Sequence, residues 1–265
     1  MTINKRNIIG IYTSEDNLRS YGKNIFDMMD KFMSRFPLEY RELFDRNLTT
    51  LYFRKCSNFC DNRLDGLYDS EHNTIYYINS IALSHELFHV ASYDPSTKKS
   101  AFERSLDSDQ GLLEGMTEYF RMKAYDLSNP VFYDFEVFAV MMLEEIEDIF
   151  KYYFIPNHDK FIKLFSSKKY IYSLLSSLDI YHLIYNCSYD ESSNRKDIKE
   201  AIRQVINSLI NIELSMISDK DELIQYRDKF MDLIESKNVK DVLDLFYPKY
   251  CGYADTLIRR RIIDR

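Results

Sequence analysis

The chain has few of the residues that interrupt helices or cross-link small domains. Among its 265 residues there are 6 Gly, 4 Cys and no Trp, whereas Tyr and Phe number 22 and 18. So few glycines beside many Ile, Lys, Asn and Tyr favour a helix-rich protein. Four cysteines are too few to stabilise a chain of this length by disulfides. The C-x-x-x-C spacing of Cys56 and Cys60 matches neither a redox pair nor a zinc ribbon.

Long apolar runs and an excess of positive charge are also missing. The apolar stretch Ile8 to Tyr12 is too short for the core of a signal peptide, and no uncharged run approaches the length of a membrane span. The net charge of −7 argues against nonspecific binding of nucleic acid. We therefore expect a cytoplasmic protein without membrane or nucleic-acid partners. The sequence carries no signal for an oligomeric state.

The first part of the chain combines helical and strand patterns. A hydrophobic content of 45% and a charged content of 29% are ordinary for a globular protein with a core. Apolar residues recur every three or four positions within residues 16–45, which predicts a helix. The stretch LTTLYFR, Leu48 to Arg54, has the composition of a strand. Within residues 65–80, GLYD and TIYYI flank the polar SEHN, which predicts a β-hairpin.

A buried helix and a helical second half follow the hairpin. Apolar residues cover much of the circumference of a helix from Leu83 to Tyr93, which indicates burial, and Asp94-Pro95 closes it. Ser96 to Gln110 is predicted to be a loop, and Ser188 to Asp197 a linker. Further helices are predicted over residues 112–127, 131–150, 161–185 (in two pieces), 198–217, 223–236 and 239–246. We therefore expect an α+β fold, with a small mixed β-sheet and a largely α-helical C-terminal half.

The stretch SHELFHV, Ser84 to Val90, holds two of the five histidines. His85 and His89 are four residues apart, so on a helix both imidazoles point from one face and can bind one metal ion. Glu86 would lie beside that metal without having to bind it. Burying these three side chains in an apolar helix costs several kcal/mol unless something compensates, and a zinc ion compensates for all three. H-E-x-x-H is the pattern of zinc hydrolases.

A catalytic zinc needs a third protein ligand and an open position for water. In the layout H-E-x-x-H-x-x-G-x-x-H the third ligand would stand at Pro95, which excludes that layout. Glu114, in LLEGMTEYF, begins a new helix after the loop, so a second helix can bring its carboxylate to the first. Glu118 lies one turn later on the same face and could accept the second N–H of His85 or His89.

Other acidic residues compete with Glu114 for the role of third ligand. Glu103, Asp107 and Asp109 fall in the polar loop, which offers no apolar frame to hold a ligand. Glu114 itself would be favoured as an exposed acid at a helix start if no metal were bound. An E-x-x-x-E pair on a helix this apolar is otherwise hard to place, so we predict Glu114 as the ligand.

A hairpin strand, then H-E-x-x-H, then a downstream helix with E-G-x-x-E-Y resembles the gluzincin branch of the zincin metallopeptidases. The resemblance covers residues 48 to 125. It implies a zincin-like catalytic region over 1–128 and a helical region over 129–265 that completes the cleft or docks substrate. It also implies that Thr74 to Ile78 is the edge strand that binds an extended peptide. The interval of 24 residues between His89 and Glu114 is longer than in the best-known relatives. The G-x-M-E-N motif of the related aminopeptidases is absent, which favours an endopeptidase.

Zinc would activate a water for attack on a peptide carbonyl, and Glu86 would act as the general base. The relatives supply a Tyr or His from downstream to stabilise the oxyanion, and the candidates here are His182, Tyr181 and Tyr185. The alternatives are a narrow regulatory protease with one partner and a non-catalytic interaction protein that keeps zinc for stability. Glu86 favours catalysis, because a purely structural site needs no base. The substrate would be a peptide or protein.

Overall fold

The computed structural model describes Asp27, Lys31, Ser34 and residues 38–48, 50–57, 65–100, 109–127, 129–146, 149, 151–154, 157–187, 195–216 and 220–236. These residues fall into two compact units. One lies within Met1–Ala101, Phe120–Asn129 and Tyr153–Pro156, and the other within Phe102–Tyr119, Pro130–Tyr152 and Asn157–Arg265. Helix α5, Gln110–Tyr125, begins in the second unit and ends in the first. The predicted roles of residues 1–128 and 129–265 stay a prediction.

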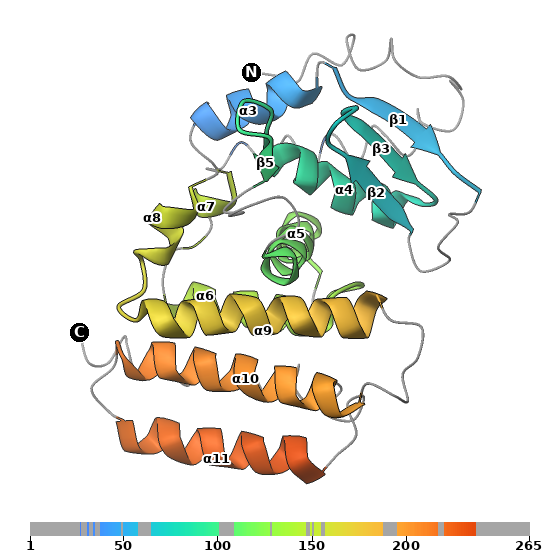
Figure 1. Ribbon diagram of the computed structural model, residues 1–265. Helices are drawn as coiled ribbons and strands as arrows, with labels where there is room; N and C mark the ends of the chain where they lie inside the picture. The colour runs from blue at the N-terminus through green and yellow to red at the C-terminus, as the bar shows by residue number, and fades with distance from the viewer. Residues whose placement is uncertain are drawn as a thin grey trace. The chain divides into compact units, whose positions relative to one another are not determined.

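The first unit is built on a small mixed sheet. Its strands are β1 (Tyr52–Lys55), β2 (Gly66–Asp69) and β3 (Thr74–Tyr77), in the order β1-β3-β2 (Figure 1). β1 runs parallel to β3, and β2 pairs with β3 in the antiparallel hairpin that the sequence predicts. The predicted α+β fold is confirmed.

β3 lies in the middle of this sheet, so the expectation that Thr74 to Ile78 forms an edge strand is wrong. Both sides of β3 are paired, since Phe53 of β1 and Tyr68 of β2 both lie opposite Ile75. The side chains of β3 are mostly buried as well, since Thr74, Ile75 and Tyr77 are all shielded from solvent. The edges belong to β1 and β2, and no strand in the described part of the chain pairs with the outer side of either.

Helix α4, Ser80–Ser92, packs against β2, β3 and helix α3, Leu38–Leu48. It begins at Asn79, whose Oδ1 accepts hydrogen bonds from the N–H groups of Ile81 and Ala82 at 3.0 and 2.9 Å. Every residue from 82 to 92 is buried, which confirms the predicted buried helix. Most of the helix predicted over residues 16–45 lies outside the described residues.

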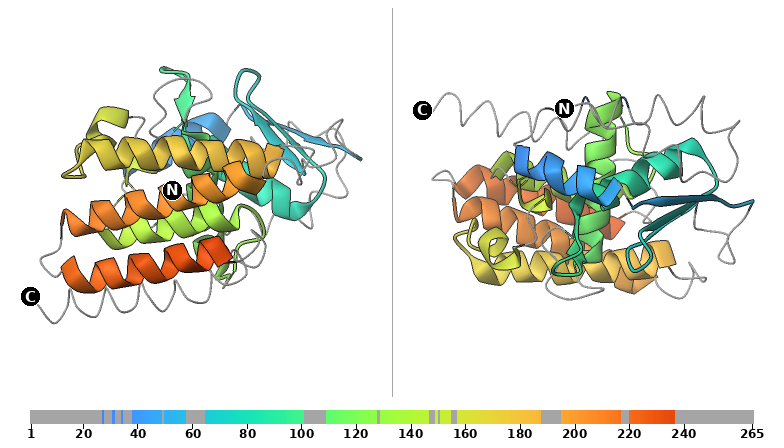
Figure 2. Two further views of the ribbon diagram at one scale, coloured as in Figure 1. Left: turned by 60° about the horizontal axis from the view of Figure 1, so that its bottom comes forward. Right: turned by 90° about the horizontal axis from the view of Figure 1, so that it is seen from above.

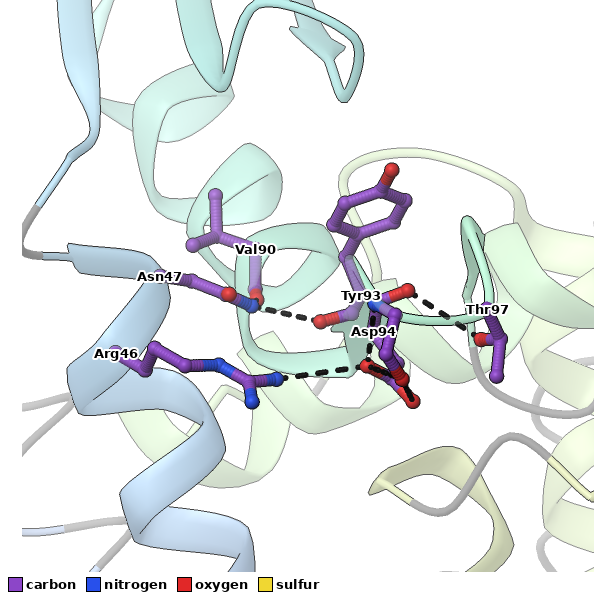
Figure 3. A network of polar contacts seen from close by, with 7 residues as sticks. Arg46, Asn47, Val90, Tyr93, Asp94 and Thr97 are labelled. Atoms are coloured by element: carbon purple, nitrogen blue, oxygen red, sulfur yellow. Dashed lines mark hydrogen bonds and ion pairs between the residues drawn. The ribbon is translucent and has the colours of Figure 1, made fainter.

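Asn47 of α3 is hydrogen-bonded to the C-terminal end of α4 (Figure 3). The amide Nδ2 of Asn47 donates to the carbonyl oxygens of Val90 and Tyr93, at 2.8 and 2.7 Å. Last-turn carbonyls have no partner within their own helix, so Asn47 satisfies groups that burial would otherwise leave unpaired. A hairpin of two short strands, β4 (Tyr93–Asp94) and β5 (Lys99–Ser100), follows α4. It lies partly within the stretch predicted to be a loop.

The second unit is helical. In Figure 2 its long helices lie side by side: α6 (Asp134–Ile146), α9 (Lys168–Cys187), α10 (Arg195–Leu214) and α11 (Lys220–Ser236). α10 packs on the other three because residues spaced three and four apart form its buried stripe, Ile198, Ala201, Ile202, Val205, Ile206 and Leu209.

Two short helices also lie within the described residues, α7 (Lys151–Phe154) and α8 (His158–Ile162). The two pieces predicted over residues 161–185 correspond to α8 and α9. The predicted helix over 239–246 and most of the predicted linker lie outside the described residues. No helix in the described part of the chain has the length and apolar character that crossing a membrane requires.

Candidate metal centre

His85, His89 and Glu114 bring three ligand atoms together. One atom from each side chain lies within 4.8 Å of the other two. Both histidines are buried on α4, and Glu114 is half-buried in the first turns of α5. These are the residues that the sequence predicts as ligands, and the group could hold a metal ion.

The spacing of the two imidazoles fits a metal ion better than a direct hydrogen bond. The Nε2 atoms of His85 and His89 face each other at 3.3 Å, longer than the usual 2.9–3.0 Å of a hydrogen bond. Two nitrogens held about 2.0–2.1 Å from a tetrahedral zinc lie about 3.3–3.4 Å apart. Two neutral imidazoles and one carboxylate are also a donor set that catalytic zinc sites use. The residues present therefore fit a zinc ion.

The carboxyl group of Glu86 lies against the backbone of β2. Glu86 is 8% exposed, and a Cβ atom at Gly66 would stand 2.7 Å from its Oε1 and 2.9 Å from its Cγ. Only glycine leaves the carboxylate room at this point of the strand. Sequence reasoning assigned no role to Gly66, although a glycine within a strand is a signal of close approach.

Glu118 holds the turn that leads from α5 to α6. It is fully buried, and its Oε1 accepts hydrogen bonds from the N–H groups of Val131 and Phe132, at 2.8 and 3.4 Å. The sequence predicts Glu118 as an acceptor for a histidine N–H, and that role stays a prediction. The contact with the turn was not foreseen.

His182 is paired with an acidic residue of α6. Its Nδ1 lies 3.0 Å from Oε1 of Glu136, and its ring centroid lies 5.5 Å from that of Tyr133. Burial alone would lower the pKa of His182. The hydrogen bond and charge of Glu136, with smaller contributions from Glu114 and Asp179, raise the pKa above its usual 6.5 instead. These acidic neighbours stabilise the protonated ring of His182 relative to the neutral one.

The other residues predicted to stabilise the oxyanion are Tyr181 and Tyr185. Tyr181 is buried with its ring against Phe135, at a centroid distance of 4.6 Å, and belongs to the core. Nothing is described of the Tyr185 side chain. The side chain of His158 is only 11% exposed and lies 3.8 Å from Asp109.

Of the acidic residues that compete with Glu114 as third ligand, the structure describes only Asp109. Asp109, predicted in a polar loop, is fully buried at the start of α5 and is not part of the metal group. Glu103 and Asp107 lie outside the described residues.

Comparisons of the chain with protein-family models, with curated proteins and with solved structures gave no match. Any function must therefore be inferred from the residues and their geometry.

Proposed function

We propose that this chain is a zinc-dependent peptidase that cleaves internal peptide bonds. His85, His89 and Glu114 would bind the metal, and Glu86 would act as the general base. The observation that carries this proposal is the grouping of two imidazoles and a carboxylate around one point, next to a buried glutamate outside the ligand set. A purely structural site has four protein ligands and needs no such glutamate.

Zinc bound at this centre would lower the pKa of its water and polarise the carbonyl of the scissile bond. Glu86 would accept a proton from the attacking water at its carboxylate and deliver it to the leaving nitrogen. Its confinement between α4 and the backbone at Gly66 supports this role, because a base must be held within hydrogen-bonding reach of one proton.

His182 would donate a hydrogen bond to the oxyanion that develops on the substrate carbonyl. Its Nδ1 faces Glu136 at 3.0 Å, and a carboxylate in this position fixes the orientation of the imidazole ring. The raised pKa supports a cationic donor, which stabilises an oxyanion better than a neutral one.

An extended peptide would pair with the outer side of β2. Asp65 bonds to Ile78 through its carbonyl oxygen, so in this antiparallel register Gly66 and Tyr68 direct their N–H and C=O groups away from β3. Gly66 is also the residue that touches Glu86. A peptide bound there would therefore run beside the general base.

The test is cleavage of a peptide library by zinc-loaded protein. We expect cleavage by the wild type, loss of at least about a hundredfold in Glu86→Gln with zinc still bound, and recovery of chelated wild type on adding zinc. Zinc binding without cleavage of any peptide, with Glu86→Gln indistinguishable from wild type, would favour the alternative of a non-catalytic zinc protein.

A further inference from the structure

The first turn of α5 is capped by a carboxylate from a distant helix. Asp179, on α9, accepts hydrogen bonds from the N–H of Asp109 at its Oδ2 and from the N–H of Gly111 at its Oδ1, at 2.9 and 3.0 Å. The first N–H groups of a helix have no partner inside the helix, so a carboxylate at this end is stabilised by both the hydrogen bonds and the helix dipole.

Asp109, the residue in the usual N-cap position of α5, does not direct its carboxylate to the first turn of the helix. Asp109 precedes α5, and its carbonyl accepts the first helical hydrogen bond from Leu113. Its φ of 61° is in the left-handed region, and its carboxylate lies toward His158, at 3.8 Å. Asp179 therefore supplies from α9 a cap that a local residue usually supplies.

Two glycines bring the neighbouring helices against the same end of α5. A Cβ at Gly111 would stand 2.6 Å from the carbonyl oxygen of Leu178, and a Cβ at Gly115 would stand 2.6 Å from the backbone of Glu136. α9 and α6 thus touch the backbone of α5 on either side of Glu114. Nothing larger than glycine fits at either contact without moving a helix backbone.

We propose that Asp179 is a positioning residue for the metal centre, which sets where α5 begins and thereby where Glu114 presents its carboxylate. This inference rests on the metal site proposed above. Glu114 lies one turn beyond the capped N–H groups, and a helix transmits a displacement of its first turn to the next. Metal ligands must be held within about 0.5 Å of their productive positions, so a loosened first turn weakens binding.

Burial raises the pKa of the Asp179 carboxyl, and the N–H donors of Gly111 and Asp109 lower it only in part. The half-buried carboxylate of Asp179 is held at the start of α5 by these two N–H donors. This contact fixes the position of the first turn of α5.

The test measures zinc affinity by competition with a chromophoric chelator, in the full chain at pH 7. We compare the wild type with Asp179→Ala, which removes both acceptors, and Asp179→Asn, which keeps one. The matched control is Asn157→Ala, because Asn157 caps α8 through a hydrogen bond to the N–H of Lys160 at 3.0 Å, and α8 carries no ligand. The visible spectrum of the cobalt-substituted proteins reports the coordination geometry of the folded fraction.

We expect zinc affinity to fall about 10–100-fold in Asp179→Ala, by a smaller factor in Asp179→Asn, and not measurably in Asn157→Ala. The cobalt spectrum should change in Asp179→Ala alone. Should Asp179→Ala not fold, Asp179→Asn carries the test and must weaken zinc binding more than Asn157→Ala does.

Wild-type zinc affinity in a folded Asp179→Ala, or equal losses in Asp179→Asn and Asn157→Ala, would overturn the positioning role and leave the proposed metal site standing. A wild type that binds no zinc would overturn both.

Discussion

The close approach of Gly66 to Glu86 makes the substitution Gly66→Ala a sharp perturbation of the general base. The added Cβ would stand 2.7 Å from Oε1 of Glu86, where ordinary contact begins at 3.4 Å. The carboxylate must therefore shift by about 0.7 Å. A misplacement of about 1 Å costs about a hundredfold in rate, so we expect kcat to fall about 10–100-fold.

Stability should change much less than activity. The atoms that must move most, Oε1 and Cγ, belong to the flexible side chain of Glu86, and Gly66 does not have a positive φ, so alanine suits its backbone. The Cβ of Ala82, at 3.1 Å, must also yield slightly. Alanine reduces the freedom of the unfolded chain, which offsets part of the strain. We expect the free energy of unfolding to change by no more than about 1 kcal/mol.

The assay is steady-state hydrolysis of a peptide found in the library screen, together with zinc content and urea unfolding of each variant. In the Glu86→Gln background, Gly66→Ala should have no further effect on kcat, because the group it displaces is already disabled. Full kcat in a folded, zinc-loaded Gly66→Ala would refute the idea that Glu86 acts from this position.

Two further perturbations test the frame around the centre. Asn47→Ala should lower the free energy of unfolding by about 2–3 kcal/mol in urea titrations, because the buried carbonyls of Val90 and Tyr93 lose their donor; an effect under about 0.5 kcal/mol would contradict this. In His182→Gln the loss of stability should be largest below pH 6.5 and shrink as the pH rises through the raised pKa of His182, since the contact with Glu136 stabilises the protonated ring. A loss of stability in His182→Gln that grows as the pH rises would contradict this prediction.

Local patterns in the sequence predicted the parts of the site that lie close together along the chain. The spacing of His85 and His89 fixes their common face once the segment is helical, and the apolar residues around them ensure that it is. Glu114 was harder to predict, because it depends on how a second helix meets the first. The apolar frame of α5 was the signal that distinguished it from acids in the loop.

Pairings between distant segments could not be read from the sequence in the same way. The buried pattern of β3 does not reveal that β1 pairs with its other side, so its assignment as an edge strand was wrong. The cap that Asp179 places on α5 joins residues 68 positions apart at Gly111, and nothing local marks it. Non-local contacts of this kind depend on the packing of whole helices, which periodicity does not specify.

The most direct test of the central claim is bound zinc per chain, by elemental analysis of protein purified without chelators. The account predicts about one zinc in the wild type, sharply weakened binding in Glu114→Ala and a milder loss in Glu118→Ala. A wild-type chain that holds no zinc even after zinc is added back would contradict it. The three side chains would then be polar groups with no metal to bind, and the peptidase proposal would fall.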